Sequence, residues 1–170
     1  MNKFIAIFSM SLLLLLSGCG NTTIEEQKEK TDGAVKEAFT SSAEKTTDTA
    51  GNVSLYLPFG ADIEKESPNN IIISKSSNTF ILFTNPNEKE DSELLYTMTV
   101  KDKNNIVAEE TFQKENRFGY YVIKQLKDNK EYELIVGVGG TKMTTQSTME
   151  NLAENSEMMM KIVRSINTED

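Results

Sequence analysis

The sequence of 170 residues contains no histidine, no tryptophan and one cysteine, Cys19. Without histidine, a candidate site lacks the commonest general base and the commonest metal ligand. One cysteine cannot form an intramolecular disulfide, a cysteine cluster for zinc or a redox pair. Basic residues are also scarce, because 18 Lys and Arg face 26 Asp and Glu, a formal net charge of −8. We therefore expect no nucleic-acid partner, since the phosphate backbone attracts basic surfaces.

The first twenty residues carry the most specific motif of the sequence. Lys3 precedes the mostly apolar run 4–16, which is short for a spanning helix and typical of a secretory signal. The run ends in L-S-G-C at positions 16–19, which resembles the lipobox of bacterial lipoproteins. The resemblance implies cleavage after a signal peptide of residues 1–18, an S-diacylglyceryl group on Cys19 and an N-acyl chain on its amine. The alternatives are an ordinary secretory signal or an uncleaved anchor.

Such an anchor makes the membrane a partner of the protein. Acyl chains contribute about 0.8 kcal/mol for each buried CH₂ group, so two or three chains hold the protein at the extracytoplasmic face of the cell membrane. Gly20 differs from the Asp that marks inner-membrane retention in bacteria with two membranes, so an outer-membrane location stays open for such a source. The chain has sixteen lysines but only Arg117 and Arg164 as arginines, a bias common in bacteria with one membrane.

Residues 19–52 contain few large apolar side chains, namely Ile24, Val35 and Phe39. Such a stretch buries too little area to offset the entropy lost on ordering. We expect residues 19–52 to form the lipidated N-terminus and a mostly disordered tether, about 30 Å long on average. The alternative is a helix around Val35, Ala38 and Phe39 that docks onto a partner.

From residue 53 onward, alternating apolar residues predict strands. The predicted strands are 53–57, 71–74, 80–84, 94–100, 106–112, 118–126 and 132–138. Short turn signals between them imply hairpins and an antiparallel sheet. Ser147 and Glu150 form an S-x-x-E capping box, which predicts a helix from there to about Ile166. Residues 53–170 are thus expected to form an α+β domain, an antiparallel sheet of about seven strands packed against a C-terminal helix.

An early strand leading into L-P-F-G at positions 57–60, followed by hairpins and a closing helix, is similar to the PsbP-like family of α+β domains. That family often places an aromatic residue after the glycine, where this sequence has Ala61. Those domains are mainly noncatalytic accessory factors. The resemblance therefore implies binding and no reaction.

Two loops have the composition of ligand sites. Residues 137–142, GVGGTK, match neither the dinucleotide fingerprint nor the P-loop, so we expect a turn at the end of a strand. Residues 85–93, NPNEKEDSE, gather oxygen side chains without the order of a calcium loop. We expect a solvated hairpin loop there, with a weak calcium site as the alternative.

Methionine and glutamate clusters are the remaining candidates for chemistry. Methionines 158–160 invite a copper site, but consecutive helix positions point about 100° apart, so we expect core packing. The glutamate pairs 109/110 and 131/133 are expected at exposed sheet edges. No pair is distinguished as catalytic. We therefore expect no catalytic residue, no metal and no cofactor.

Phe118, Tyr120 and Tyr121 lie in one predicted strand, where alternation places Phe118 and Tyr120 on one face and Tyr121 on the other. One face must be core, and we expect these residues to serve packing alone, with an aromatic recognition surface on the other face as the alternative. The sequence as a whole predicts an extracytoplasmic lipoprotein with a noncatalytic binding or accessory domain and an envelope protein partner. The alternatives are an envelope hydrolase that uses paired carboxylates and a small-ligand carrier.

Overall fold

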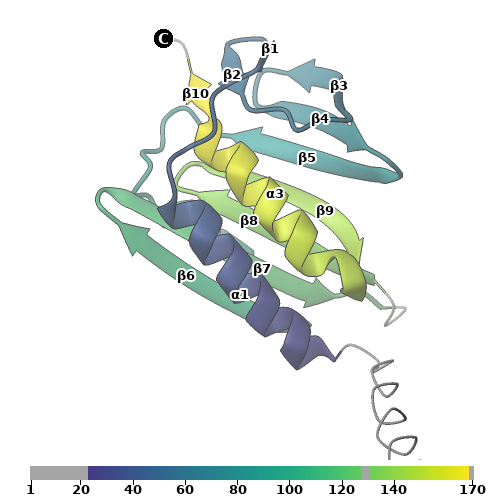
Figure 1. Cartoon of the computed structure of the whole chain (residues 1–170). Coiled ribbons are helices and arrows are strands. Elements are labelled where there is room, and N and C mark those ends of the chain that lie inside the picture. Colours follow the sequence, from purple (N-terminus) through teal and green to yellow (C-terminus); the bar gives the residue numbers. More distant parts are fainter. Residues whose placement is uncertain (1–22, 128–130, 169–170) are drawn as a thin grey trace, which may run out of the picture.

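The computed structural model describes residues 23–127 and 131–168, and its centre is a seven-stranded antiparallel sheet (Figure 1). The strand order is β3-β4-β5-β9-β8-β7-β6, so every strand from β3 to β9 belongs to it. The strands are β3 (Ala61–Ser67), β4 (Asn70–Lys75), β5 (Asn78–Thr84), β6 (Ile106–Lys114), β7 (Arg117–Gln125), β8 (Glu131–Val138) and β9 (Thr141–Thr148). With a C-terminal helix against the sheet, the predicted α+β class is confirmed.

Helices cover both faces of this sheet. Helices α1 (Ile24–Thr40) and α3 (Leu152–Ser165) lie side by side on one face, and the 3-10 turn η1 (Met149–Asn151) precedes α3 (Figure 1). The short helix α2 (Leu94–Val100) packs on the other face through Leu95. A second sheet, β1-β2-β10, joins Asp48–Ala50, Val53–Leu55 and Asn167–Thr168. None of the helices in the described ranges has the length and apolar character needed to cross a membrane.

Helix α1 corrects the predicted tether. Its N-terminus carries a capping box, in which Thr23 Oγ1 accepts a hydrogen bond from the Glu26 N–H at 3.2 Å and the Glu26 carboxylate accepts from the Thr23 N–H at 3.3 Å. Val35 and Phe39 are buried in the main core. The predicted alternative, a docking helix around these residues, is therefore correct in its helix, but the helix packs onto its own domain and not onto a partner. The tether prediction is wrong over Ile24–Thr40, because α3 and β6 supply the apolar surface that α1 lacks.

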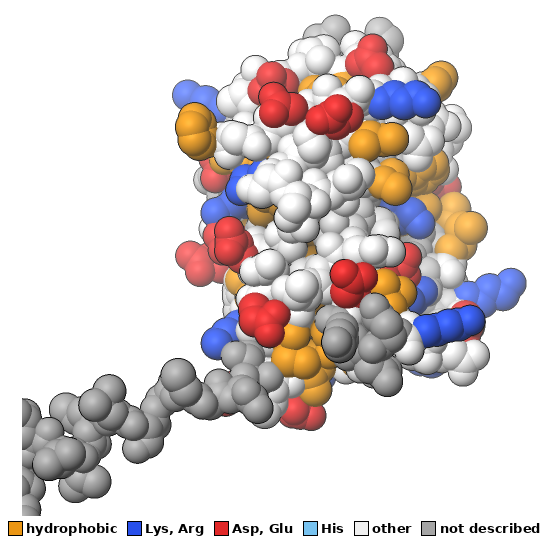
Figure 2. Space-filling model, turned by 90° about the vertical axis from the view of Figure 1, so that its right-hand side faces the viewer, with side chains coloured by type: hydrophobic (Ala, Val, Ile, Leu, Met, Phe, Trp, Pro, Cys, Tyr) orange, Lys and Arg blue, Asp and Glu red, His pale blue; other side chains and the backbone are white. Residues whose placement is uncertain are grey.

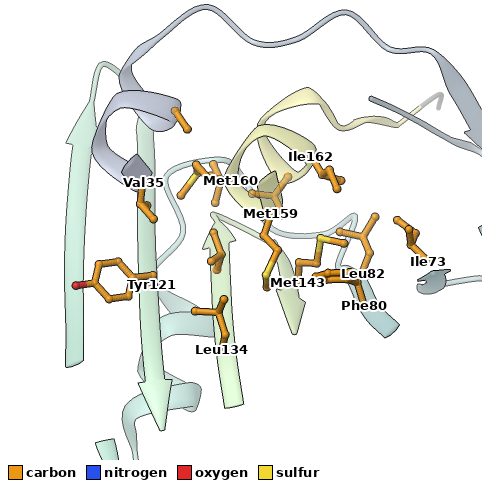
Figure 3. Close-up of a cluster of buried hydrophobic side chains, with 14 of the residues drawn as sticks. Val35, Ile73, Phe80, Leu82, Tyr121, Leu134, Met143, Met159, Met160 and Ile162 are labelled. Carbon is orange, nitrogen blue, oxygen red and sulfur yellow. The ribbon is translucent and has the colours of Figure 1, made fainter. Parts of the chain in front are cut away.

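Side chains from both helices and from the sheet point toward one another in the main core (Figure 3). Met143 of β9 and Met159 and Met160 of α3 are fully buried there. Unbranched thioether side chains fill irregular space between helices and sheet, which explains why this core uses them. Packing is thus the confirmed role of these methionines.

A polar contact also attaches α1 to the sheet. The Tyr121 hydroxyl of β7 donates a hydrogen bond to the Asp32 carboxylate of α1. At the C-terminal end of the helix, Lys114 Nζ donates to the carbonyl oxygen of Thr40. The middle and the C-terminal end of α1 are therefore held to the β6-β7 side of the sheet.

Two local predictions are wrong. Residues 94–100 form the helix α2 and not a strand. Leu95 and Thr99, one helical turn apart, are its buried residues. The prediction failed because seven mostly apolar residues are compatible with both the helical and the strand period. The proposed capping box is also wrong, because Ser147 lies in β9 and α3 begins at Leu152. Ser147 Oγ instead accepts a hydrogen bond from Asn155 Nδ2 at 3.0 Å.

Candidate functional site

The aromatic residues of β7 do not form a recognition surface. Phe118, Tyr120 and Tyr121 are 5%, 0% and 0% exposed. Their predicted alternation is confirmed: Phe118 and Tyr120 pack under α2, whereas Tyr121 lies in the main core. Tyr96 of α2 covers the first two, with ring centroids 5.6 and 5.4 Å away. Packing is therefore confirmed, and the alternative of a recognition surface is wrong, because helices cover both faces of the sheet at this strand.

The L-P-F-G segment lies in the turn that leads into β3. Gly60 has φ +77°, in the left-handed region that favours glycine, and Phe59 is fully exposed. On the face in Figure 2, acidic and basic side chains are interspersed and hydrophobic side chains form small separate groups. That face therefore presents no single large apolar docking surface.

The glycine-rich segment 137–142 forms the turn between β8 and β9, as predicted. Loop 85–90 crosses this turn: the Asn85 N–H donates to the Gly140 carbonyl at 2.8 Å, and Glu90 accepts from the Phe118 N–H at 2.9 Å. Gly139 has φ +51°, and a Cβ there would clash with the backbone of residues 89 and 90. The glycines thus allow close backbone approach of the acidic loop.

The glutamate pairs predicted at sheet edges take different places in the sheet. In the described residues, no group of three or more His, Cys, Asp or Glu side chains could hold a metal ion. The glutamate pair 109/110 lies on the edge strand β6, as predicted. The pair 131/133 lies on β8, inside the sheet, so its predicted edge position is wrong.

A cavity of about 200 Å³ brings together both arginines of the chain, and we call it the arginine cleft. Its walls are the end of β5, loop 85–90, the β8-β9 turn, the start of β7 and the end of α3 with Asn167. The C-terminal end of α3 lies at the top of Figure 1. The cleft is polar, since Thr84, Thr141 and Asn85 line it together with Arg117 and Arg164.

The two arginines have different partners. Arg117 Nη2 is 2.8 Å from a Glu115 carboxylate oxygen, and its Nε is 3.8 Å from Glu90. Arg164 lies over the Phe39 ring and donates through Nη2 to the Ser41 carbonyl at 2.7 Å, just beyond the end of α1. Burial and the nearby charge of Arg117 lower the pKa of Arg164. Arg164 forms no ion pair within the described part of the chain.

Thr84 lies between the arginine cleft and a second cavity. It lines both, and the second cavity measures about 240 Å³ and is lined in part by Val53, Ile71 and Leu82. Thr84 is 8% exposed, and its hydroxyl oxygen has no hydrogen-bond partner among the described residues. The same holds for the buried Nε of Arg164. Both atoms are enclosed by the protein and have almost no accessible surface.

Comparison with known proteins adds no relative: no protein-family model matches the chain, and no curated protein matches it. The cleft itself has no local sequence signal, because its residues come from four separate segments of the chain. The one available cue was the scarcity of arginine, since both arginines meet at this cleft.

Proposed function

We propose that this protein is a lipid-anchored extracytoplasmic lipoprotein whose domain acts by binding, without catalysis. The observation that carries the anchor is the L-S-G-C motif at positions 16–19, behind Lys3 and an apolar run. This part of the chain lies outside the described residues, so the proposal rests on its sequence. The binding role is supported by the arginine cleft and by the resemblance to PsbP-like accessory domains.

With this anchor, only a short stretch of chain would separate the lipid from helix α1. The N-cap of α1 is Thr23, four positions after Cys19. Four residues span at most about 14 Å when fully extended. A lipid on Cys19 would therefore keep the start of α1 close to the bilayer, where the predicted tether would have allowed a larger separation. Helix α1 is about 25 Å long at 1.5 Å per residue, and its far end contacts Arg164 of the cleft.

Binding is favoured over hydrolysis at the cleft because its described carboxylates already have partners. Glu88 accepts a hydrogen bond from Ser92 Oγ, and Glu90 lies against Arg117. The small-ligand carrier is the second candidate, and the cavity beside Thr84 favours it. Both candidate functions, the binding domain and the small-ligand carrier, require the domain to hold a ligand reversibly at the membrane surface.

The anchor is tested by metabolic labelling of cells with a fatty-acid analogue that can be detected on protein. We expect Cys19→Ala to abolish the label and to accumulate precursor that retains residues 1–18, because no other cysteine can form the thioether. Ser17→Ala is the matched control, since it keeps a small residue before the cleavage position and should be labelled and processed normally. Normal labelling and maturation of Cys19→Ala would refute the anchor.

A further inference from the structure

The seven-stranded sheet ends in two edge strands, β3 and β6, which differ in how well they are protected (Figure 1). Proteins protect exposed sheet edges with bulges and charged side chains. Strand β3 has a bulge in its middle, between Ile63 and Lys65, and a run of charged residues around it. In β6 the irregularity lies at the start, between Ile106 and Ala108, and the pairing with β7 is regular from Ala108 to Lys114. No described segment pairs with the outer edge of this regular stretch.

Three backbone positions of β6 point away from β7. In an antiparallel pair, alternate residues exchange N–H and C=O groups with the partner strand, and the residues between them direct these groups outward. The Thr111 N–H donates to the carboxylate of the neighbouring Glu110 at 3.2 Å, so Thr111 is one of the outward residues. Glu109 and Gln113 share its alternation and therefore point outward as well. The edge thus presents a row of backbone groups to which another strand can add.

A groove of about 460 Å³ lies between this edge and helix α1. Phe112 of β6 lines it and is half-buried, with its ring centroid 5.9 Å from that of Phe39 of α1. Gly33 of α1 also lines the groove, although glycine inside a helix is destabilising relative to alanine. A Cβ at this glycine would meet nothing within 4 Å beyond its own helix. Packing therefore does not require Gly33, and its missing side chain leaves the groove wide.

The charges of the groove indicate the chemistry of an added strand. Its lining includes the carboxylates of Asp32 and Glu110 and one ammonium group, that of Lys36. Both carboxylates lie near the Tyr121 phenol, because each of them raises the pKa of that group. An added strand would accept the Thr111 N–H in its own ladder and so release the Glu110 carboxylate. A lysine or arginine opposite Glu110 would then pair with this carboxylate.

Side-chain alternation adds a second requirement for the added strand. Glu110 and Phe112 are two positions apart, so both project to the face of the sheet on which α1 lies. Side chains directly opposite each other on neighbouring strands contact each other. The added strand would therefore place an apolar residue opposite Phe112 and its cation opposite Glu110.

We propose that the outer edge of β6 binds an extended segment of a partner protein by antiparallel strand addition, and that this segment carries an apolar residue followed two positions later by a lysine or arginine. This deepens the proposed function by naming the class of partner, and it rests on the binding role of the domain. Its test does not involve the anchor, so the two proposals fail independently. Loss of lipid labelling concerns Cys19, and loss of peptide binding concerns the edge of β6.

The probe is the peptide acetyl-Thr-Ile-Thr-Arg-Thr-amide, whose isoleucine would lie opposite Phe112 and whose arginine would lie opposite Glu110. The receptor is ¹⁵N-labelled full-length protein in an uncharged detergent at neutral pH. We expect saturable shifts of the backbone amide resonances of the outward residues Glu109, Thr111 and Gln113. Replacing the arginine of the peptide by glutamate should weaken binding by about fivefold or more, because an attractive cross-strand pair becomes a repulsive one.

Thr111→Pro tests the edge directly. The Thr111 N–H points away from β7, so a proline there removes an outward donor without breaking a hydrogen bond between β6 and β7. We expect folded Thr111→Pro, checked by circular dichroism, to show no detectable peptide binding. Thr111→Val keeps the N–H and is the matched control, which should bind normally. Gly33→Gln is the second variant: it favours the helix but fills the groove, and it should weaken binding by about threefold or more.

Three results would overturn the proposal. The first is the absence of saturable shifts at the three outward amides. The second is equal affinity for the arginine and the glutamate peptide. The third is normal binding by folded Thr111→Pro or, should that variant not fold, by Gly33→Gln.

Discussion

Truncating Phe39 to alanine should lower the free energy of unfolding by about 3–5 kcal/mol, as for other buried aromatic residues. Phe39 is 1% exposed and packs against Phe112, with ring centroids 5.9 Å apart, and beneath the Arg164 guanidinium. Its ring also occupies the space beside Gly119, where a Cβ would lie 2.6 Å from two of its atoms. The truncation therefore leaves a cavity between α1 and the β6-β7 hairpin.

Urea unfolding followed by circular dichroism measures this loss. Lys36→Ala is the matched control, because Lys36 is exposed on the same helix, and its effect should stay within about 0.5 kcal/mol. If residues 24–40 were a tether, both substitutions would be nearly neutral. Equal stability of Phe39→Ala and Lys36→Ala would contradict the placement of α1 in the core.

Alkaline pH should destabilise the domain sharply. Burial raises the pKa of Tyr120, and burial together with the neighbouring Asp32 carboxylate raises the pKa of Tyr121. Below pH 10 both phenols keep their protons in the folded and unfolded states. Above pH 10 the unfolded chain releases these protons while the folded chain retains them, so stability falls by about 1.4 kcal/mol per pH unit for each tyrosine. Together the two residues should remove about 2.8 kcal/mol per pH unit.

Denaturant unfolding at pH 9, 10, 10.5 and 11 would measure this slope. Tyr121→Phe should remove about half of the contribution of the pair above pH 10. The comparison is of slopes, since this variant also loses the hydrogen bond to Asp32 at neutral pH. If the substitution left the slope unchanged, the pKa of Tyr121 would be the same in the folded and the unfolded chain, which would contradict the prediction.

The sequence predicted those elements whose hydrophobic pattern is local, and it missed those that are buried by distant parts of the chain. Strands β7 and β8 are rich in apolar and aromatic residues and were predicted close to their bounds. Strand β9 was missed because it is rich in threonine, and its burial comes from central pairing with β5 and β8. Helix α1 was misjudged because its few apolar residues are buried by segments far along the chain.

The cleft depends even more on tertiary structure. Arg117 begins β7 and Arg164 ends α3, and only the packing of α3 on the sheet brings them to one cavity. Likewise, nothing local indicated that the Thr84 hydroxyl lacks a partner, because that depends on every element around it. The glycine-rich turn was predicted from its spacing, but its role as the support of loop 85–90 required the structure.

We propose that the chain is lipid-anchored at Cys19, four positions before the N-cap of α1. Mass spectrometry of the tryptic peptide 19–28 from membrane-extracted protein tests it most directly. We predict a mature chain that begins at Cys19, with the peptide heavier by a thioether-linked diacylglyceryl group. A peptide that extends into residues 1–18, or one with an unmodified Cys19 thiol, would contradict the claim.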